Sequence, residues 1–225
     1  MTLDNPATGH QQAGWVPTKA TEGQSGFPHE DSLVHPGRSR HISQPLDRVH
    51  LGDTIAAALP SQPMATDPSG DLVLTPLHGD PRSLEEWLTT FHFASVVLDP
   101  YTNQSSWILP TARRILHAFR GAAVRANFLI TCGPDEAREF LGPLAEEFLV
   151  FCDPDRTAVR SLGLSSLPAF VFVRGDGKLV ASAEGWDPAA WRKVAREIAT
   201  TTAWSYPTIP EAGDPSPFEG SSAAG

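Results

Sequence analysis

Cysteine is scarce in this sequence, which has only two among its 225 residues. Two cysteines do not make the disulfide framework of a small secreted protein. No apolar run reaches the roughly 18 residues that a membrane-spanning helix needs. The amino terminus, MTLDNPATGHQQAGW, lacks the basic and apolar segments of a secretory signal peptide. These absences predict a cytoplasmic protein that does not insert into a membrane.

Positive charge is also in short supply. The 17 lysines and arginines are outnumbered by 26 aspartates and glutamates, and the formal net charge is -9. Sequence-independent binding to DNA or RNA, and attraction to an anionic membrane surface, both need a surplus of basic residues. We therefore expect no nucleic-acid partner.

Motifs for cofactors and metals are absent as well. The sequence has no Walker loop, no dinucleotide-binding glycine motif and no Gly-x-Ser-x-Gly elbow, so no cofactor is predicted. Four of the eight histidines cluster within residues 29–50, but their spacing fits no zinc pattern and no cysteine joins them. We expect no metal site, and we interpret His92 and His117 as structural. The four clustered histidines are His29, His35, His41 and His50.

Proline and glycine, 21 and 18 in number, divide the chain into three zones. Residues 1–70 are rich in both and predict an extended or disordered arm. Residues 71–200 are periodic and have the length of one domain. Four prolines in residues 201–225 exclude a regular helix or central strand and predict an extended tail. Both ends carry aromatic residues that can dock on the domain itself or on another subunit, namely Trp15, Phe27, Trp204, Tyr206 and Phe218.

Hydrophobic periodicity in the middle zone predicts alternating strands and helices. Continuous apolar runs such as ASVVL are typical of strands that are buried on both faces. Ser83 with Glu86 forms a capping box, and Asp187 before Pro188 marks another helix start. The predicted strands cover residues 71–77, 94–98, 126–132, 148–152, 169–173 and 178–184, and the predicted helices cover residues 83–91, 106–119, 134–148, 154–162 and 188–199.

The stretch SLGLSSLPAFVFVRGDGKLVASAEGW resembles the later part of thioredoxin-like proteins. In that family a helix leads to a loop, a cis X-Pro bond, a β-hairpin with a glycine-containing turn, and a closing helix. The resemblance extends over residues 71–200 and implies that Leu167-Pro168 is the cis bond. It also implies an α/β fold with a mixed central sheet and helices on both faces, flanked by the long irregular arms.

The inserted segment TCGPDEAREFLGPLAEEFLVFCDPDRTAVRSLGL resembles the peroxiredoxin and thiol-oxidoreductase branch of the same superfamily. Aligning Pro110 with the proline of the family's catalytic helix puts Thr102 and Ser105 at the positions of the two active-site cysteines. A serine or threonine hydroxyl stays protonated near neutral pH and cannot replace a thiolate. The family's chemistry is therefore expected to be absent at this position.

The loop that opens this helix has two interpretations. Its hydroxyls can cap a helix that begins near Trp107. Alternatively, the loop and the expected cis bond can form a binding site at the carboxyl edge of the sheet, where open α/β folds usually bind ligands. The candidate binding residues are Tyr101, Thr102, Asn103, Gln104, Ser105, Leu167 and Pro168.

The two cysteines also have two interpretations. Cys132 and Cys152 each end an apolar strand, and if these strands are parallel neighbours the thiols lie at one sheet edge, close enough for a disulfide. They are then a displaced redox pair. Otherwise both are small buried hydrophobic residues, the usual state of free cysteine in a cytoplasmic protein.

The two interpretations lead to two expected functions. The first is a redox-inactive binding or assembly component, which engages a protein partner or a multi-subunit complex through its arms and its cis-proline edge. The second is a thiol oxidoreductase or peroxidase that uses Cys132 and Cys152. An enzyme of that kind needs an accessible, acidic thiol, whereas a binding component needs neither.

Overall fold

The structure, a computed structural model, describes residues 65–224. Most of the predicted amino-terminal arm, including its histidines and the aromatic residues Trp15 and Phe27, therefore lies outside the described residues. Within residues 65–224, no helix combines the length and the apolar character needed to cross a membrane.

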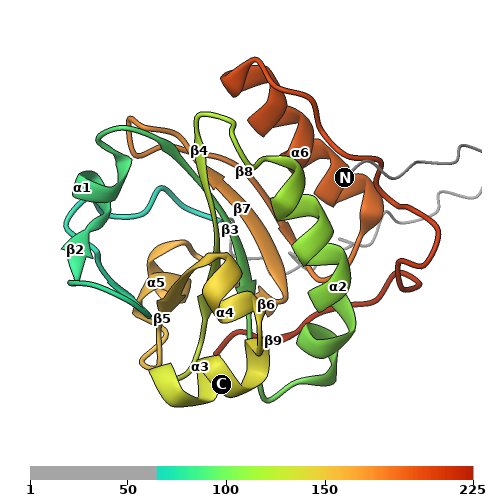
Figure 1. The fold of residues 1–225 in the computed structure, drawn as a ribbon, viewed down its shortest axis with the longest axis horizontal. Helices are drawn as coiled ribbons and strands as arrows, with labels where there is room; N and C mark the ends of the chain where they lie inside the picture. Colours follow the sequence, from blue (N-terminus) through green and yellow to red (C-terminus); the bar gives the residue numbers. More distant parts are fainter. Residues whose placement is uncertain (1–64, 225) are drawn as a thin grey trace, which may run out of the picture. The chain divides into compact units, whose positions relative to one another are not determined.

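A seven-stranded mixed sheet forms the centre of the described region, in the order β2-β1-β5-β4-β3-β7-β8 (Figure 1). The middle pairs β3·β4 and β4·β5 are parallel, and the outer pairs are antiparallel. The strands are β1 (Val73–Pro76), β2 (Arg82–Ser83), β3 (His92–Leu98), β4 (Val124–Ile130), β5 (Leu149–Cys152), β7 (Ala169–Val173) and β8 (Leu179–Glu184).

Helices cover both faces of this sheet, as predicted. Apolar residues of α2 (Asn103–Ala118), α3 (Pro134–Leu141), α4 (Leu144–Glu147) and α6 (Pro188–Thr202) share one core cluster. Residues of α1 (Leu84–Leu88) and α5 (Thr157–Ser161) belong to a second cluster on the other face. Strand β3 contributes alternate residues to the two clusters and is buried along almost its whole length, which confirms its prediction as a central strand.

Several helix ends follow local signals in the sequence. The Ser83 hydroxyl and the Glu86 side chain form the predicted capping box of α1. Asp187 caps α6 by accepting a hydrogen bond of 2.9 Å from the backbone N–H of Ala189, and Pro188 is its first residue. The predicted apolar face of α6 is buried: Trp191, Val194, Ala195 and Ile198.

Three predicted helix boundaries are wrong. The second helix begins at Asn103 rather than Ser106, with Thr102 as its N-cap residue. The helix predicted for residues 134–148 breaks into α3 and α4 at Gly142, whose φ of 54° favours glycine. The helix predicted from Pro154 begins at Thr157, although the Asp153 carboxylate still accepts hydrogen bonds from two of its backbone N–H groups.

A polar pair lies inside the otherwise apolar centre of the sheet. Ser95 on β3 and Asn127 on β4 are register partners, and both are fully buried. The Ser95 hydroxyl donates to the Asn127 side-chain oxygen at 2.6 Å, and the amide nitrogen donates to two backbone carbonyls. The pair is thus satisfied internally, which is what allows polar groups to be buried at this depth.

The carboxyl-terminal tail docks on the domain itself. Trp204 donates from its indole to the Ala118 carbonyl at 2.9 Å, and the Arg196 guanidinium donates to the Tyr206 hydroxyl and lies over its ring. Phe218 packs edge-on against Trp107. These contacts confirm, for the tail, the first of the two docking alternatives that the aromatic residues suggested.

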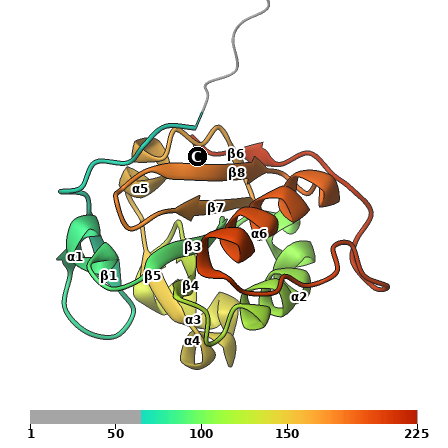
Figure 2. The same ribbon diagram turned by 90° about the horizontal axis from the view of Figure 1, so that it is seen from above.

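The tail beyond α6 contains one short strand that the sequence did not indicate. A short strand, β9 (Ser221–Ser222), pairs antiparallel with β6 (Ser166–Leu167) in a separate two-stranded sheet. Figures 1 and 2 show the tail leaving α6, passing alongside α2 and ending beside β6. A pattern of glycine, serine and alanine carries no strand signal, so this pairing depends on long-range contacts.

Candidate functional site

The carboxyl ends of the parallel strands meet at one edge of the sheet. Backbone hydrogen bonds join Thr131 to Leu98 and Asp153 to Ile130, so the loops after β3, β4 and β5 run side by side. Because Val97 is the register partner of Ala169, the loop after β3 also faces Pro168. The Leu167-Pro168 bond is cis, as the resemblance implied. The predicted site residues from these separate segments therefore do come together.

The two hydroxyls at the start of α2 are used to hold the preceding loop. The Thr102 hydroxyl donates to the Asp99 carbonyl at 2.9 Å and lies 3.1 Å from the Ser105 hydroxyl. The Ser105 hydroxyl accepts from the Asp99 backbone N–H at 2.9 Å, and its side chain is fully buried. Neither hydroxyl caps a backbone N–H of the helix, so the capping interpretation is wrong in its detail.

Two large aromatic side chains close to these hydroxyls in the sequence are exposed. Tyr101 in the loop is 71% exposed, and Trp107 in α2 is 55% exposed. Asn103 is exposed and Gln104 is half-buried on the same first turn. Of the candidate binding residues in this loop, Ser105 is thus the one whose side chain is closed off from solvent.

The expected cis-proline edge is covered by the protein's own tail. Leu167 and Pro168 are both buried. The backbone of Leu167 is paired with Ser221, and the Pro168 carbonyl accepts from Gly185 at 2.8 Å. Another strand can pair with β6 at this place only after the tail has moved away, and binding by Leu167 and Pro168 stays a prediction.

β4 and β5 are parallel neighbours, as predicted; Cys152 ends β5, whereas Cys132 lies two residues beyond the end of β4 at Ile130. Both thiols are free and buried. Burial, reinforced by the nearby Cys152 thiol and by the carboxylates of Glu136 and Asp99, raises the pKa of Cys132 to about 12. Burial also raises the pKa of Cys152, although the positive charge of Arg138 opposes the change. Both thiols are therefore held in the protonated form near neutral pH.

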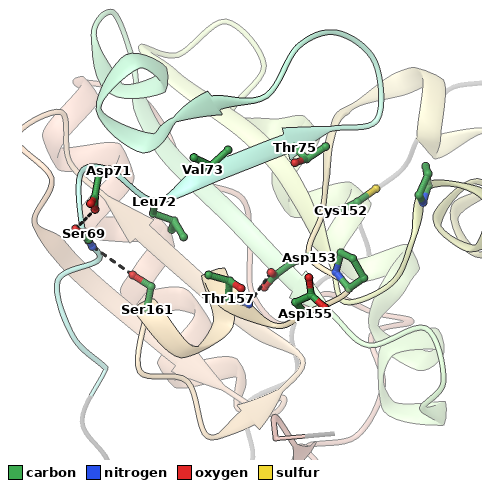
Figure 3. Close-up of a pocket in the computed structure, with 12 residues that line it drawn as sticks. Ser69, Asp71, Leu72, Val73, Thr75, Cys152, Asp153, Asp155, Thr157 and Ser161 are labelled. Carbon is green, nitrogen blue, oxygen red and sulfur yellow. Dashed lines mark hydrogen bonds between the residues drawn. The ribbon is translucent and has the colours of Figure 1, made fainter.

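A pocket of about 650 Å³ opens beside Cys152 (Figure 3). Cys152 lies at one end of it, and Ser69 and Ser161 lie at the other. The Asp153 carboxylate on its wall is already occupied by the backbone N–H groups of α5. No cluster of three or more metal-binding side chains occurs anywhere in residues 65–224.

Sequence reasoning missed Arg156, which joins the separate parts of this edge. Its guanidinium donates to the Asp99 carboxylate at 2.7 Å and to the Ala223 carbonyl at 3.0 Å. The side chains of Arg156 and Asp99 are only 14% and 6% exposed, so this is a largely buried ion pair. Arg156 also has a φ of 53°, which is unusual for a residue with a side chain. No local pattern links residues 57 positions apart, and Asp99, directly after a buried strand, is the sole hint.

No family model matches the sequence, and no curated protein matches it either. Solved structures do resemble it. A putative thiol:disulfide interchange protein DsbE from Chlorobium tepidum aligns with a TM-score of 0.52 and 16% identity, over 61% of this chain and 97% of that one. A putative thioredoxin from Neisseria meningitidis aligns with a TM-score of 0.50 and 16% identity, over 60% and 89%.

The chain has a thioredoxin-like fold. Peroxiredoxin Q from Xanthomonas campestris also aligns, with a TM-score of 0.47 and 13% identity, over 60% of this chain and 91% of that one. At 16% identity, the likeness to the DsbE and thioredoxin structures shows the fold alone and leaves the activity to be argued from the site itself.

Proposed function

We propose that this thioredoxin-like protein is a binding or assembly component that engages a protein partner at the start of α2 and performs no thiol chemistry there. The observation that carries the proposal is the exposed pair Tyr101 and Trp107, in a protein whose two thiols are buried. Tyrosine and tryptophan are the residues most enriched among those that dominate binding energy at protein interfaces.

The state of the thiols supports the absence of redox chemistry. A thiol with a pKa near 12 has a thiolate fraction of about 10⁻⁵ at pH 7, against about 3% for an unperturbed cysteine. At the start of α2, Thr102 and Ser105 offer hydroxyls that are already engaged with Asp99. Neither place offers the nucleophile that disulfide exchange or peroxide reduction requires.

The alternative function is a thiol oxidoreductase or peroxidase that uses Cys132 and Cys152. One observation favours it, because the two cysteines lie at the same sheet edge and Cys152 lines an open pocket. The raised pKa of both thiols opposes it. A conformational opening that exposes a thiol and lowers its pKa is a requirement of this alternative.

A thiol titration separates the two functions. The rate of alkylation by iodoacetamide is measured from pH 6 to 10 for the native protein and for the Cys132→Ser and Cys152→Ser variants. We expect both native thiols to react only when the protein is unfolded. A thiol that reacts in the folded protein with an apparent pKa below about 8.5, together with a reversible disulfide, would establish the oxidoreductase instead.

A site-specific crosslink tests the binding role. A photoreactive amino acid is placed at position 101, at position 107 or, as a control on the tail, at position 206. We expect one defined protein adduct from positions 101 and 107. The purified partner should then bind at least tenfold more weakly to Tyr101→Ala and Trp107→Ala, and equally well to Tyr206→Ala. The same adducts at all three positions, or none, would refute the docking site.

A further inference from the structure

The last residues of the described chain lie along β6 in the way that a bound peptide adds a strand to a sheet edge. Ser222 and Ser221 pair with Ser166 and Leu167. The Ala223 backbone N–H extends the ladder by donating to the Ser165 carbonyl at 2.9 Å. Main-chain hydrogen bonds of this kind supply affinity for an extended segment, and the adjoining side-chain pockets supply its specificity.

Two small residues in the tail fit this edge closely. At Gly220, an added Cβ atom would lie 2.7 Å from the Leu167 carbonyl oxygen and 2.8 Å from the Ser166 hydroxyl oxygen. Distances this short require the backbone of β6 to move, so a side chain at this position is excluded. Three residues later, Ala223 is 3% exposed within the core cluster that includes Leu164 and Leu167. A larger side chain there would overpack the core.

Arg156 also forms a hydrogen bond with the backbone of the same segment. One of its terminal nitrogens donates to the Ala223 carbonyl, while the other is held by the Asp99 carboxylate. Because Asp99 belongs to the loop after β3, the guanidinium stays oriented when the tail is absent. Its fixed fork of N–H groups then presents a free donor to an incoming carbonyl or carboxylate.

The remainder of the tail is anchored elsewhere. Asp214 accepts hydrogen bonds from Thr111 at 2.8 Å and from Arg114 at 2.7 Å. Ile209 is buried, and Arg192 of α6 donates to its carbonyl at 2.6 Å. Residues 219–224 can therefore leave β6 while the earlier part of the tail stays in place. A pairing of two residues on each strand is short enough to open locally.

We infer that residues 219–224 act as an internal inhibitor of the docking groove formed by residues 165–167 and Arg156, which accepts an extended protein segment with glycine at one position and alanine three positions later. The protein's own residues 219–224 fill this groove, and a partner segment of the same pattern must compete with them. The inference rests on the proposed binding function and adds to it the autoinhibition of partner binding and the specificity of the segment that displaces the tail.

The test uses the full chain and the heptapeptide EGSSAAG, which has the sequence of residues 219–225. The ¹⁵N-labelled protein is titrated with this peptide and chemical-shift changes are followed at the amides of residues 165–167. In the Gly220→Val chain the internal segment no longer fits, so we expect saturable shifts with an apparent Kd about tenfold below that of the native chain. The matched control is Ser222→Val, which adds the same side chain at an exposed position of β9 and should behave like the native chain.

Specific outcomes overturn the inference. Equal affinities for the native and Gly220→Val chains would show that the tail does not close the groove. An absence of shifts at residues 165–167 in a folded Gly220→Val chain would show that there is no groove. A peptide with valine in place of its glycine should not bind, and its binding would refute the proposed specificity.

A second measurement uses the native chain and does not depend on the folding of any variant. Excess peptide should accelerate hydrogen exchange at the Ala223 amide, because the displaced tail loses its hydrogen bond to Ser165. Unchanged exchange would refute the competition. Neither measurement involves Tyr101 or Trp107, so a failure here and a failure of the crosslinking test are distinguishable.

Discussion

The start of α2 and the ends of β4 and β5 lie at the same edge of the sheet. Thiol chemistry requires both an exposed, activating position and a thiol, and each region has only one of the two. The start of α2 has exposure and a helix N-terminus, and it has hydroxyls where thiols would be needed. The ends of β4 and β5 have the two thiols, and both are buried among apolar atoms and negative charge. Position and chemical group are therefore separable in this fold, and each can be changed independently.

The largest effect is expected when a thiol is moved to the start of α2. In a Thr102→Cys variant, the N-terminus of a 16-residue helix should lower the pKa of the introduced thiol below about 8.5. We expect alkylation at pH 7 at least about 10³-fold faster than that of the native Cys132, whose pKa is near 12. The measurement is the pseudo-first-order rate with a fluorescent iodoacetamide.

The control for this prediction is Thr200→Cys, which places an exposed thiol near the other end of a helix. The helix dipole does not favour a thiolate there, so the reaction should be slower than at position 102. A thiol at position 102 that reacts as slowly as Cys132 would show that the start of α2 does not lower the pKa of a thiol.

The next effect concerns the ion pair that joins the two regions. Arg156→Met leaves the Asp99 carboxylate buried without its partner, so we expect the free energy of unfolding to fall by about 3 kcal/mol. Urea denaturation measures the change. Arg174→Met is the control, because its ion pair with Asp176 is about half exposed and screened by solvent, so its loss should lower stability less. Equal losses in the two variants would mean that the buried pair does not hold this edge together.

A smaller effect should show what kind of residue the native cysteines are. If Cys132 and Cys152 act as small buried hydrophobic residues, alanine should be tolerated better than serine at each position. A serine hydroxyl buried without a partner costs about 1–3 kcal/mol, whereas alanine loses only the sulfur contacts. Thermal unfolding of the four single variants measures this order. A preference for serine at either position would indicate that the thiol is hydrogen-bonded or accessible.

The smallest expected effect is a pH dependence of stability that comes from Asp214, the tail residue bonded to α2. Burial opposes ionisation of Asp214, but hydrogen bonds from the Glu211 backbone, Thr111 and Arg114 together lower its pKa below the ordinary 3.8. A lowered pKa means that Asp214 contributes stability above the unfolded value and loses it as the pH falls through the folded value.

The Asp214→Asn variant should therefore lose less stability than the native protein between pH 5 and pH 3. Urea denaturation at each pH gives the comparison. Asp80→Asn, which changes an exposed carboxylate between β1 and β2, is the control and should follow the native curve. If the native protein and Asp214→Asn lose the same stability between pH 5 and pH 3, this carboxylate does not anchor the tail.

Much of the fold could be predicted because its signals are local. The capping box at Ser83 and Glu86, the Asp187-Pro188 helix start and the buried β3 each depend on residues within a few positions of one another. The predicted start of α2 was wrong because Asn103 and Gln104 are polar and do not continue the apolar pattern of the helix. They are helical because of where the chain lies after β3. Local propensity had no information about that position.

The candidate site was predictable only in part, for the same reason. The resemblance placed Thr102, Ser105 and Pro168 correctly at one edge. It could not indicate that Arg156 joins Asp99 to Ala223, since those three residues lie far apart in the sequence. The strand formed by Ser221 and Ser222 was missed because only its partner, β6, makes it a strand.

The buried pair of Ser95 and Asn127 has a consequence for how the sheet assembles. Most residues of β3 and β4 are aliphatic or aromatic, so several alignments of the two strands would bury similar apolar area. In a shifted alignment, Asn127 would lose its side-chain hydrogen bonds to Ser95 and to the Ala94 carbonyl across the strand pair, a cost of about 1–3 kcal/mol for a buried polar group left unpaired. The pair therefore favours the native register of β3 and β4 over shifted registers that would bury a similar apolar area.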